Sequence, residues 1–174
     1  MKALVLAAGY GTRLGNLTKD RPKAMIKVGS KPVIGHIVDN LVKSGVRQII
    51  VNIHYLPEKI PEYLGDRVLY YYEPVLLGHK GTIEALKDWL DDDFLVINAD
   101  TINNLDYKKM IKYHQKGTIT VLMDEWRAAG TWIYPYEYFD NPKVEVRPYR
   151  PKGLFWMDIG SPDKLKEARQ YAKN

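Results

Sequence analysis

Apolar and polar residues alternate along the chain in blocks of strand length and helix length. Residues 2–8 form a continuous apolar run, and runs of similar character occur at 48–53 and 93–98. Uninterrupted apolar runs of this length are typical of parallel strands that are buried on both faces. Further strands are predicted for residues 67–72, 118–123 and 130–134.

Helical periodicity separates these runs. Between residues 32 and 44, apolar positions recur on one helical face, and Gly45 follows as a typical helix end. Ser161 and Pro162 are a favourable N-cap and first-turn pair, which predicts a helix extending to about Ala172. Helices or helical links are also predicted for residues 56–64, 79–90 and 105–115.

One long segment, 134–153, follows neither pattern and is rich in Pro, Tyr and Arg, so we expect a loop or lid there. Elsewhere the alternation of strands and helices predicts a three-layer α/β/α fold with a Rossmann-like, mostly parallel sheet. No linker, repeat or low-complexity tract interrupts the 174 residues, so a single domain is expected over 1–174. Ligands of such folds bind at the carboxyl ends of the strands.

Composition and charge indicate which kinds of ligand and metal site the protein is expected to have. The net charge of +5 is spread along the chain rather than gathered in a basic stripe, so we expect small anionic ligands and no nucleic acid. The absence of cysteine excludes disulfides and thiolate zinc sites. The apolar run after Lys2 is too short for a signal peptide or a bilayer span, which predicts a cytoplasmic protein without a membrane partner. The histidines have no metal-ligand spacing and are interpreted as structural or surface residues: His36, His54, His79 and His114.

The strongest chemical signal is the turn after the first apolar run. Residues 9–13 read Gly-Tyr-Gly-Thr-Arg, which places exposed backbone N–H groups and Arg13 at a strand end. Lys23 follows a proline ten residues later. Backbone N–H groups and fixed cations are what a polyphosphate needs. The dinucleotide pattern fails because its third glycine position is Leu14, and no Gly-Lys-Ser/Thr ends the turn as a Walker motif requires.

These residues resemble those of the sugar-phosphate nucleotidyltransferases, in particular the compact heptose- and mannose-1-phosphate guanylyltransferases. Residues 6–14, Leu-Ala-Ala-Gly-Tyr-Gly-Thr-Arg-Leu, are similar to the family's first nucleotide loop, and Lys23 with its preceding proline matches the motif that follows it. Residues 73–82 resemble the second nucleotide loop. The stretch 96–100 resembles the strand-end Gly-Asp, with alanine in place of glycine, and 156–162 resembles the Trp-x-Asp-Ile-Gly-Thr-Pro element.

The resemblance implies which residues form the site. The nucleotide-binding residues are Leu6, Ala8, Gly9, Gly11, Thr12, Arg13, Glu73 and Gly78. The catalytic residues are Arg13, Lys23, Asp100 and Asp158, of which Asp100 and Asp158 hold Mg²⁺. The sugar-phosphate residues are Lys23, Lys80 and Gly130.

Physical chemistry supports the two aspartates as a pair. Each alone could be only a turn former, Asp100 after an apolar strand and Asp158 before the helix cap. Two such carboxylates beside a phosphate loop are better explained by Mg²⁺, a hard cation that proteins hold with one or two carboxylates plus phosphate oxygens.

The reaction that the resemblance implies is transfer of a nucleotidyl group from an NTP to a sugar 1-phosphate, giving an NDP-sugar and pyrophosphate. The acceptor phosphate has a second pKa near ~6, so it is already a dianion at neutral pH and needs no general base. Arg13 would hold the β and γ phosphates, and Lys23 would neutralise charge as the two phosphates meet. A carboxylate at Glu73 matches the paired N–H donors of guanine, which favours GTP; otherwise Glu73 is a surface carboxylate before a proline.

The chain also departs from the family pattern. The second loop reads Gly-His-Lys-Gly, so Lys80 either binds the sugar phosphate or is simply exposed. The usual Glu-Lys-Pro element is missing, which leaves open a choline phosphate or inositol phosphate acceptor, or a non-catalytic regulatory domain that binds nucleotides. A monomer or homodimer is expected. Four cations are candidates to replace the missing element: Arg127, Arg147, Arg150 and Lys152.

Overall fold

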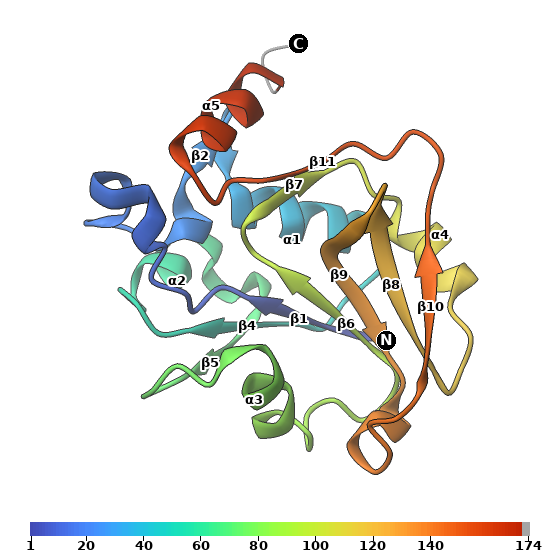
Figure 1. The fold of residues 1–174 in the computed structure, drawn as a ribbon. Coiled ribbons are helices and arrows are strands. Elements are labelled where there is room, and N and C mark those ends of the chain that lie inside the picture. The colour runs from blue at the N-terminus through green and yellow to red at the C-terminus, as the bar shows by residue number, and fades with distance from the viewer. Residues whose placement is uncertain (172–174) are drawn as a thin grey trace.

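A computed structural model describes residues 1–171 of the chain and shows a twisted central sheet covered by helices on both faces (Figure 1). The sheet strands are β1 (Lys2–Leu6), β4 (Ile49–Ile53), β5 (Leu69–Tyr72), β6 (Phe94–Asn98), β8 (Thr118–Asp124), β9 (Arg127–Tyr134) and β10 (Glu145–Tyr149). The helices are α1 (Val33–Lys43), α2 (Lys59–Leu64), α3 (Gly78–Ala85), α4 (Tyr107–Tyr113) and α5 (Pro162–Tyr171).

The seven strands are arranged in the order β10-β8-β9-β6-β1-β4-β5. The parallel part of the sheet consists of β6, β1, β4 and β5. In it, β1 pairs with both β4 and β6, and β4 pairs with β5. Two short ladders lie outside this sheet: β2 (Lys27–Val28) with β3 (Lys31–Pro32), and β7 (Thr101–Asn103) with β11 (Trp156–Asp158). The predicted mostly parallel, three-layer α/β fold is therefore confirmed.

The apolar run of β1 is continuous because the strand is buried on both faces. Ala3 and Val5 face a large core cluster, to which α1, α2, α4 and α5 contribute, whereas Leu4 faces a smaller cluster that contains Ile83 of α3. Ala3, Val5 and Leu4 have no solvent exposure. Burial of successive residues on opposite faces is expected for a strand with period two.

The C-terminal half of the sheet differs from the sequence-based expectation. β9 begins at Arg127 and runs antiparallel between β6 and β8. The expected loop or lid at 134–153 is wrong in part, because residues 145–149 form β10, which pairs in parallel with β8 at the edge of the sheet. Pro148 lies in this strand, which is tolerated because an edge strand has one unpaired side.

The remaining expectations differ mainly at element ends. The helix predicted for 79–90 is regular only to Ala85 and continues as turns. The last helix is described to Tyr171, and its predicted end near Ala172 lies outside the described residues. Within residues 1–171, every helix is too short or too polar to cross a membrane.

Candidate active site

The glycine loop after β1 is held against Lys23 by close packing. Gly11 has φ +68, and a Cβ atom there would lie 3.0 Å from both Lys23 Cβ and Thr18 Cγ2. The hydroxyl of Thr18 donates to the Gly11 carbonyl at 3.2 Å. Only glycine combines this backbone conformation with so little room. The loop continues as a 3₁₀ turn over Thr12–Thr18, broken at Gly15, a short helical element that the sequence pattern did not predict.

Lys23 connects the loop to the end of β6. It begins a 3₁₀ turn directly after Pro22, which fixes the backbone there. Its Nζ atom lies 2.6 Å from Asp100 Oδ2, and the two side chains are 13% and 31% exposed. A charged pair at this depth is screened less than a surface pair. The structure thus brings together two of the predicted catalytic residues.

Asp158 reaches the same place from the C-terminal part of the chain. It lies opposite Thr101 in the β7–β11 ladder, and the N–H of the next residue, Ile159, donates to the carbonyl oxygen of Asp100 at 2.8 Å. The two aspartates that the sequence separates are therefore neighbours across two strands. Their backbones are thus adjacent, although Asp100 lines the cavity and Asp158 does not.

The carboxylate of Asp158 is strongly hydrogen-bonded. Its Oδ1 accepts from the Gly160 N–H at 2.9 Å, and its Oδ2 is paired with the ammonium of Lys164. Burial alone would raise the pKa of Asp158, but the bonds from Lys164 and Gly160 outweigh it and hold the pKa below the usual value. Asp158 is therefore ionised at neutral pH.

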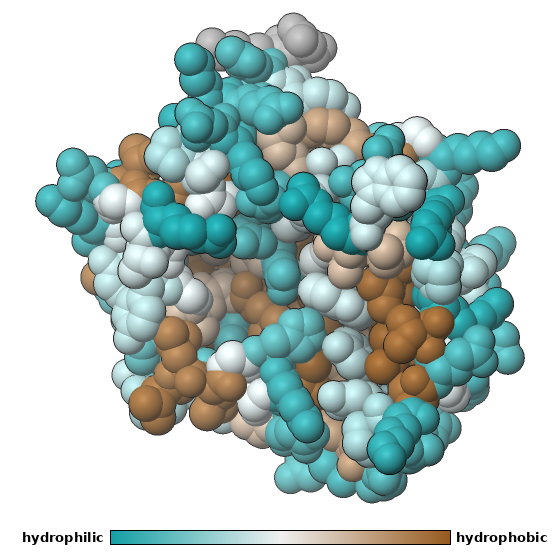
Figure 2. All heavy atoms as spheres, viewed as in Figure 1, coloured by the Kyte–Doolittle hydropathy of each residue, from teal (hydrophilic) through white to brown (hydrophobic). Residues whose placement is uncertain are grey.

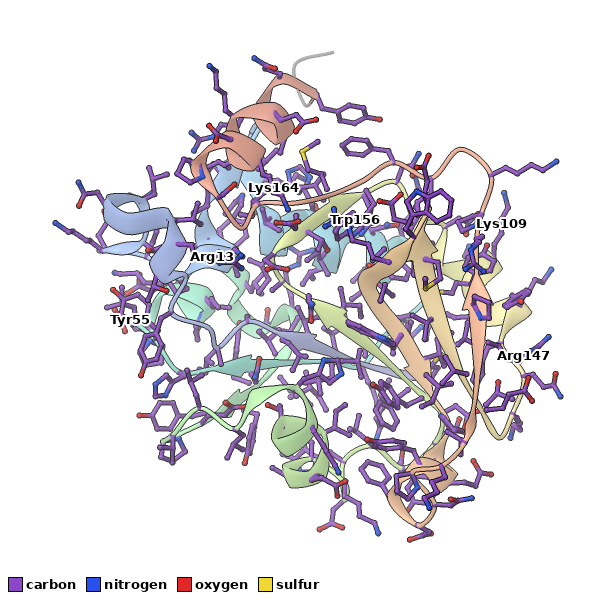
Figure 3. The ribbon with its side chains drawn as sticks, viewed as in Figure 1. Arg13, Tyr55, Lys109, Arg147, Trp156 and Lys164 are labelled. Carbon is purple, nitrogen blue, oxygen red and sulfur yellow. The ribbon has the colours of Figure 1, made fainter. Side chains whose placement is uncertain are left out.

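Arg13 approaches this carboxylate because Gly160 has no side chain. A Cβ atom at Gly160 would lie 2.8 Å from Asp158 Oδ1 and 3.3 Å from Arg13 Nη2. Arg13 is exposed, and within residues 1–171 it forms no ion pair. Figure 3 shows Arg13 and Lys164 directed toward the same central region from different parts of the chain. A guanidinium without a protein partner is available to an anionic ligand.

A cavity of about 460 Å³ opens at the carboxyl ends of β1 and β6. In the view of Figure 2, hydrophilic side chains border a hollow near the centre of this face. Seven predicted site residues line the cavity: Leu6, Gly9, Gly11, Thr12, Arg13, Lys23 and Asp100. Six residues that were not predicted line it too: Ala7, Ala24, His79, Asn98, Ala99 and Gly160.

Glu73 does not lie where the base-contact interpretation places it. Its side chain is fully buried, so neither the predicted contact with the base nor the alternative of a surface carboxylate matches its position. Its Oε1 accepts from Thr82 Oγ1 at 2.5 Å and Asn52 Nδ2 at 2.8 Å, and its Oε2 accepts from the Leu77 N–H at 3.1 Å. Asn52 in turn accepts from the Ala7 N–H at 2.6 Å. Glu73 therefore joins the second loop to the end of β1.

Four other predicted residues lie near the cavity but do not line it. Ala8 is buried, and Gly78, at φ +69, begins α3. Gly130 lies behind the cavity wall, where a Cβ atom would be 3.4 Å from Asn98 Cβ. Lys80 is exposed, and its two interpretations both stay predictions.

Two of the arginines considered as replacements for the missing element pack on aromatic rings instead. The guanidinium of Arg127 lies 4.7 Å from the centre of the Trp156 ring, and that of Arg147 lies 5.2 Å from the centre of the Tyr113 ring. Neither lines the cavity. Such cation–π contacts are ordinary ways to place an arginine at a protein surface.

His79 is the residue that sequence reasoning missed most clearly. His79 lines the cavity, and the centre of its ring lies 4.8 Å from that of Trp132 in an edge-on arrangement. Its Nε2 lies 3.3 Å from the hydroxyl of Tyr134. Burial lowers the pKa of His79 below the ordinary 6.5, so the ring is neutral at pH 7. The only signal in the sequence was its place within the second loop.

The residues present fit a magnesium ion. Asp100 and Asp158 offer carboxylate oxygens, the donors that this hard cation prefers. Among residues 1–171, no three His, Cys, Asp or Glu side chains form a metal-binding group. The site would therefore supply one or two carboxylates and leave the other ligand positions to phosphate oxygens and water, which is the usual way that proteins hold Mg²⁺.

A glycine loop and two cations at the carboxyl ends of parallel strands are typical of α/β proteins that bind nucleotide phosphates. A family model described as nucleotidyl transferase matches residues 2–132, and the chain belongs to this family. The resemblance seen in the sequence is therefore confirmed at the level of the family.

Curated relatives carry sugar-phosphate names. The mannose-1-phosphate guanylyltransferase catalytic subunit beta of Danio rerio is 32% identical over 89% of this chain and 49% of its own length. The UTP–glucose-1-phosphate uridylyltransferase AglF of Haloferax volcanii is 36% identical over 87% of this chain and 67% of its own length. The chain thus spans about half the length of the guanylyltransferase relatives that it matches.

Solved structures share the fold. HddC from Yersinia pseudotuberculosis superposes with a TM-score of 0.83 at 23% identity and covers 98% of both chains. The UDP-glucose pyrophosphorylase from Acinetobacter baumanii gives a TM-score of 0.82 at 18% identity, covering 98% of this chain and 92% of that one. Likeness at this identity supports the fold of the whole described chain.

Proposed function

We propose that this chain transfers a nucleotidyl group from an NTP, with GTP favoured, to a sugar 1-phosphate, and releases an NDP-sugar and pyrophosphate. The observation that carries the proposal is the convergence of Arg13, Lys23 and Asp100 on one cavity at the carboxyl edge of the sheet. Expectations of one domain, a cytoplasmic location and a monomer or homodimer stay predictions.

Different residues around the cavity are proposed to bind different phosphates of the substrates. Backbone groups of Gly9 and Gly11 face the cavity and suit the triphosphate. Arg13, exposed beside the loop, would bind the β and γ phosphates and stabilise the departing pyrophosphate. Lys23, between the loop and Asp100, would offset the charge that accumulates as the two phosphates approach each other.

The chemical step needs no protein nucleophile. A phosphate oxygen of the acceptor forms a bond to the α-phosphorus, and the bond from that phosphorus to the bridging oxygen breaks. The electron pair leaves with pyrophosphate, so atoms and charge balance. Because the acceptor phosphate is ionised near neutral pH, the contribution of the protein reduces to positioning and electrostatic stabilisation.

Magnesium is the cofactor that the site fits best, and Asp100 and Asp158 are the residues proposed to hold it. When bound there, it would supply positive charge to the phosphate oxygens of both substrates. Asp100 lines the cavity. Asp158 does not, but it accepts a hydrogen bond from the N–H of Gly160, which lines it.

The choice of GTP and of a sugar acceptor is supported by the names of the guanylyltransferase relatives, since the buried Glu73 does not reach a base. The uridylyltransferase relative makes UTP the main competitor. Because the Glu-Lys-Pro element is missing, choline phosphate and inositol phosphate are the acceptors to compare with sugar 1-phosphates.

A substrate panel tests the proposal. Pyrophosphate release is measured with four NTPs against hexose 1-phosphates, heptose 1-phosphate, choline phosphate and inositol phosphate, and products are identified by mass spectrometry. We expect turnover with GTP and a sugar 1-phosphate, dependent on Mg²⁺. Turnover only with a non-sugar phosphate would overturn the acceptor assignment, and NTP binding without turnover of any acceptor would indicate a regulatory domain.

A further inference from the structure

The neutral imidazole of His79 belongs to a residue of the cavity wall, and the proposed reaction does not use it. His79 stands at the start of α3 and lines the cavity together with Leu6 and Asn98, which come from the ends of β1 and β6. Within this lining, over the part of the chain that the structure describes, His79 is the only aromatic residue.

The orientation of the ring is fixed by two residues of β9. The hydroxyl of Tyr134 lies 3.3 Å from His79 Nε2, and the ring of Trp132 meets the imidazole at an interplanar angle of 87°. Tyr134 is itself stacked on Phe94, with ring centres 5.7 Å apart. A side chain held in this way loses little further conformational entropy when a ligand binds.

One ring nitrogen remains for a ligand. Nε2 is occupied by Tyr134, whereas Nδ1 has no hydrogen-bond partner among residues 1–171. A neutral imidazole presents a donor on one nitrogen and an acceptor on the other. A hydroxyl group both donates and accepts, so it matches Nδ1 in either tautomer. A phosphate only accepts, and it has stronger partners in Arg13 and Lys23.

From this geometry we infer that His79 is a specificity-determining residue whose Nδ1 hydrogen-bonds a sugar hydroxyl of a substrate. The hydroxyl belongs either to the ribose of the NTP or to the acceptor sugar, since both are sugars that this cavity would hold. The inference depends on the proposed function only for the identity of these two sugars. The apolar neighbours Leu6 and Ala7 suit the carbon face of such a ring.

The test uses three substitutions that separate the two ring nitrogens. His79→Asn keeps a polar atom near the position of Nδ1, His79→Gln keeps one near Nε2, and His79→Ala keeps neither. We expect His79→Ala to raise the KM for one sugar-bearing substrate about tenfold, the cost of losing one hydrogen bond and leaving its partner unpaired, with little change in kcat. Only His79→Asn should restore binding. Glu84→Ala, an exposed change on the same helix, is the matched control and should leave both KM values unchanged.

Deoxy analogues identify the sugar. If the contact is with ribose, the wild type binds 2′- or 3′-deoxy-GTP about tenfold more weakly than GTP by calorimetry, and His79→Ala binds both equally. If the contact is with the acceptor, the same pattern appears with a deoxy sugar 1-phosphate. The inference is overturned if all three variants behave alike, or if neither class of analogue distinguishes the wild type from His79→Ala. A wild-type chain that binds GTP but turns over no sugar phosphate would contradict the proposed function, while the binding comparisons with both classes of deoxy analogue, which need no turnover, would still decide the role of His79.

Discussion

The ammonium of Lys23 lies 2.6 Å from the carboxylate of Asp100, although 77 positions separate the two residues in the chain. One partner follows the glycine loop, and the other lies in the turn after β6, the strand next to β1. Their contact places the cation proposed to bind phosphate and a carboxylate proposed to hold Mg²⁺ side by side in the lining of one cavity.

Replacing Lys23 with methionine should lower turnover by about 10²–10³-fold, because a cation positioned at the reacting phosphates is lost. Because the pair is mostly buried and Asp100 would lose its partner, the free energy of unfolding should fall by about 1–3 kcal/mol. Steady-state pyrophosphate release and urea unfolding measure the two effects. Lys19→Met, an exposed change nearby, is the control, and equal loss in both variants would refute the assignment of Lys23.

Gly11→Ala should damage the site more than its backbone strain alone explains. The new methyl group would lie 3.0 Å from Lys23 and Thr18, in addition to the strain of alanine at φ +68. Gly45→Ala is a matched control, because Gly45 has φ +87 with open space around it. Thermal unfolding should show a cost of about 1 kcal/mol for Gly45→Ala and a larger cost for Gly11→Ala, with loss of GTP binding only in the latter. Similar losses in the two variants would argue against the close packing of the loop.

Glu73→Gln tests the role of the buried carboxylate. Glu73 accepts hydrogen bonds from Thr82, Asn52 and Leu77, and an amide would place N–H groups against some of these donors. We expect a loss of stability of about 1–3 kcal/mol, measured by urea unfolding. The ratio of kcat/KM for GTP to that for UTP should stay the same, because the side chain is fully buried. A change in this ratio without a change in stability would restore Glu73 as a residue that reads the base.

The neutral His79 makes stability depend on pH in a definite direction. Burial lowers its pKa in the folded state below 6.5, and the groups of β9 that face it, Trp132 and Tyr134, are uncharged at these pH values. The unfolded chain therefore binds a proton more readily, so the free energy of unfolding falls as the pH drops through 6.5 toward the folded-state pKa.

Urea unfolding of the wild type and of His79→Asn between pH 7.5 and 5.5 measures this effect. The stability of the wild type relative to His79→Asn should decrease as the pH is lowered. A difference that stays constant or increases would contradict the assignment of a buried neutral ring.

Much of the fold could be predicted because the pattern of apolar residues within each segment indicates its secondary structure and its burial. The apolar run of β1 reflects burial on two faces, and the stripe of α1 reflects burial on one. β10 was missed because its sequence, Glu-Val-Arg-Pro-Tyr, is polar and contains proline, and only its edge position makes that acceptable. Nothing local shows that β9 runs antiparallel to β6.

Some residues of the candidate site could also be predicted from local motifs, whereas others depend on contacts between distant parts of the chain. Gly11, Lys23 and Asp100 could be expected to lie together because short motifs place them at strand ends and turns, and all three line the cavity. The burial of Glu73 could not be predicted, because its partners Asn52 and Thr82 lie 21 and 9 positions away and meet it only in the folded chain. The position of His79 depends in the same way on contacts with β9.

The most direct test is the turnover of Asp100→Asn, measured as pyrophosphate release from GTP and a sugar 1-phosphate, with GTP binding followed separately by calorimetry. Because this change removes one of two carboxylates proposed to hold Mg²⁺ while keeping the size of the side chain, the rate should fall by about 10³-fold or more and the fold should be retained. A variant that turns over at the rate of the wild type would contradict the site proposed for this protein.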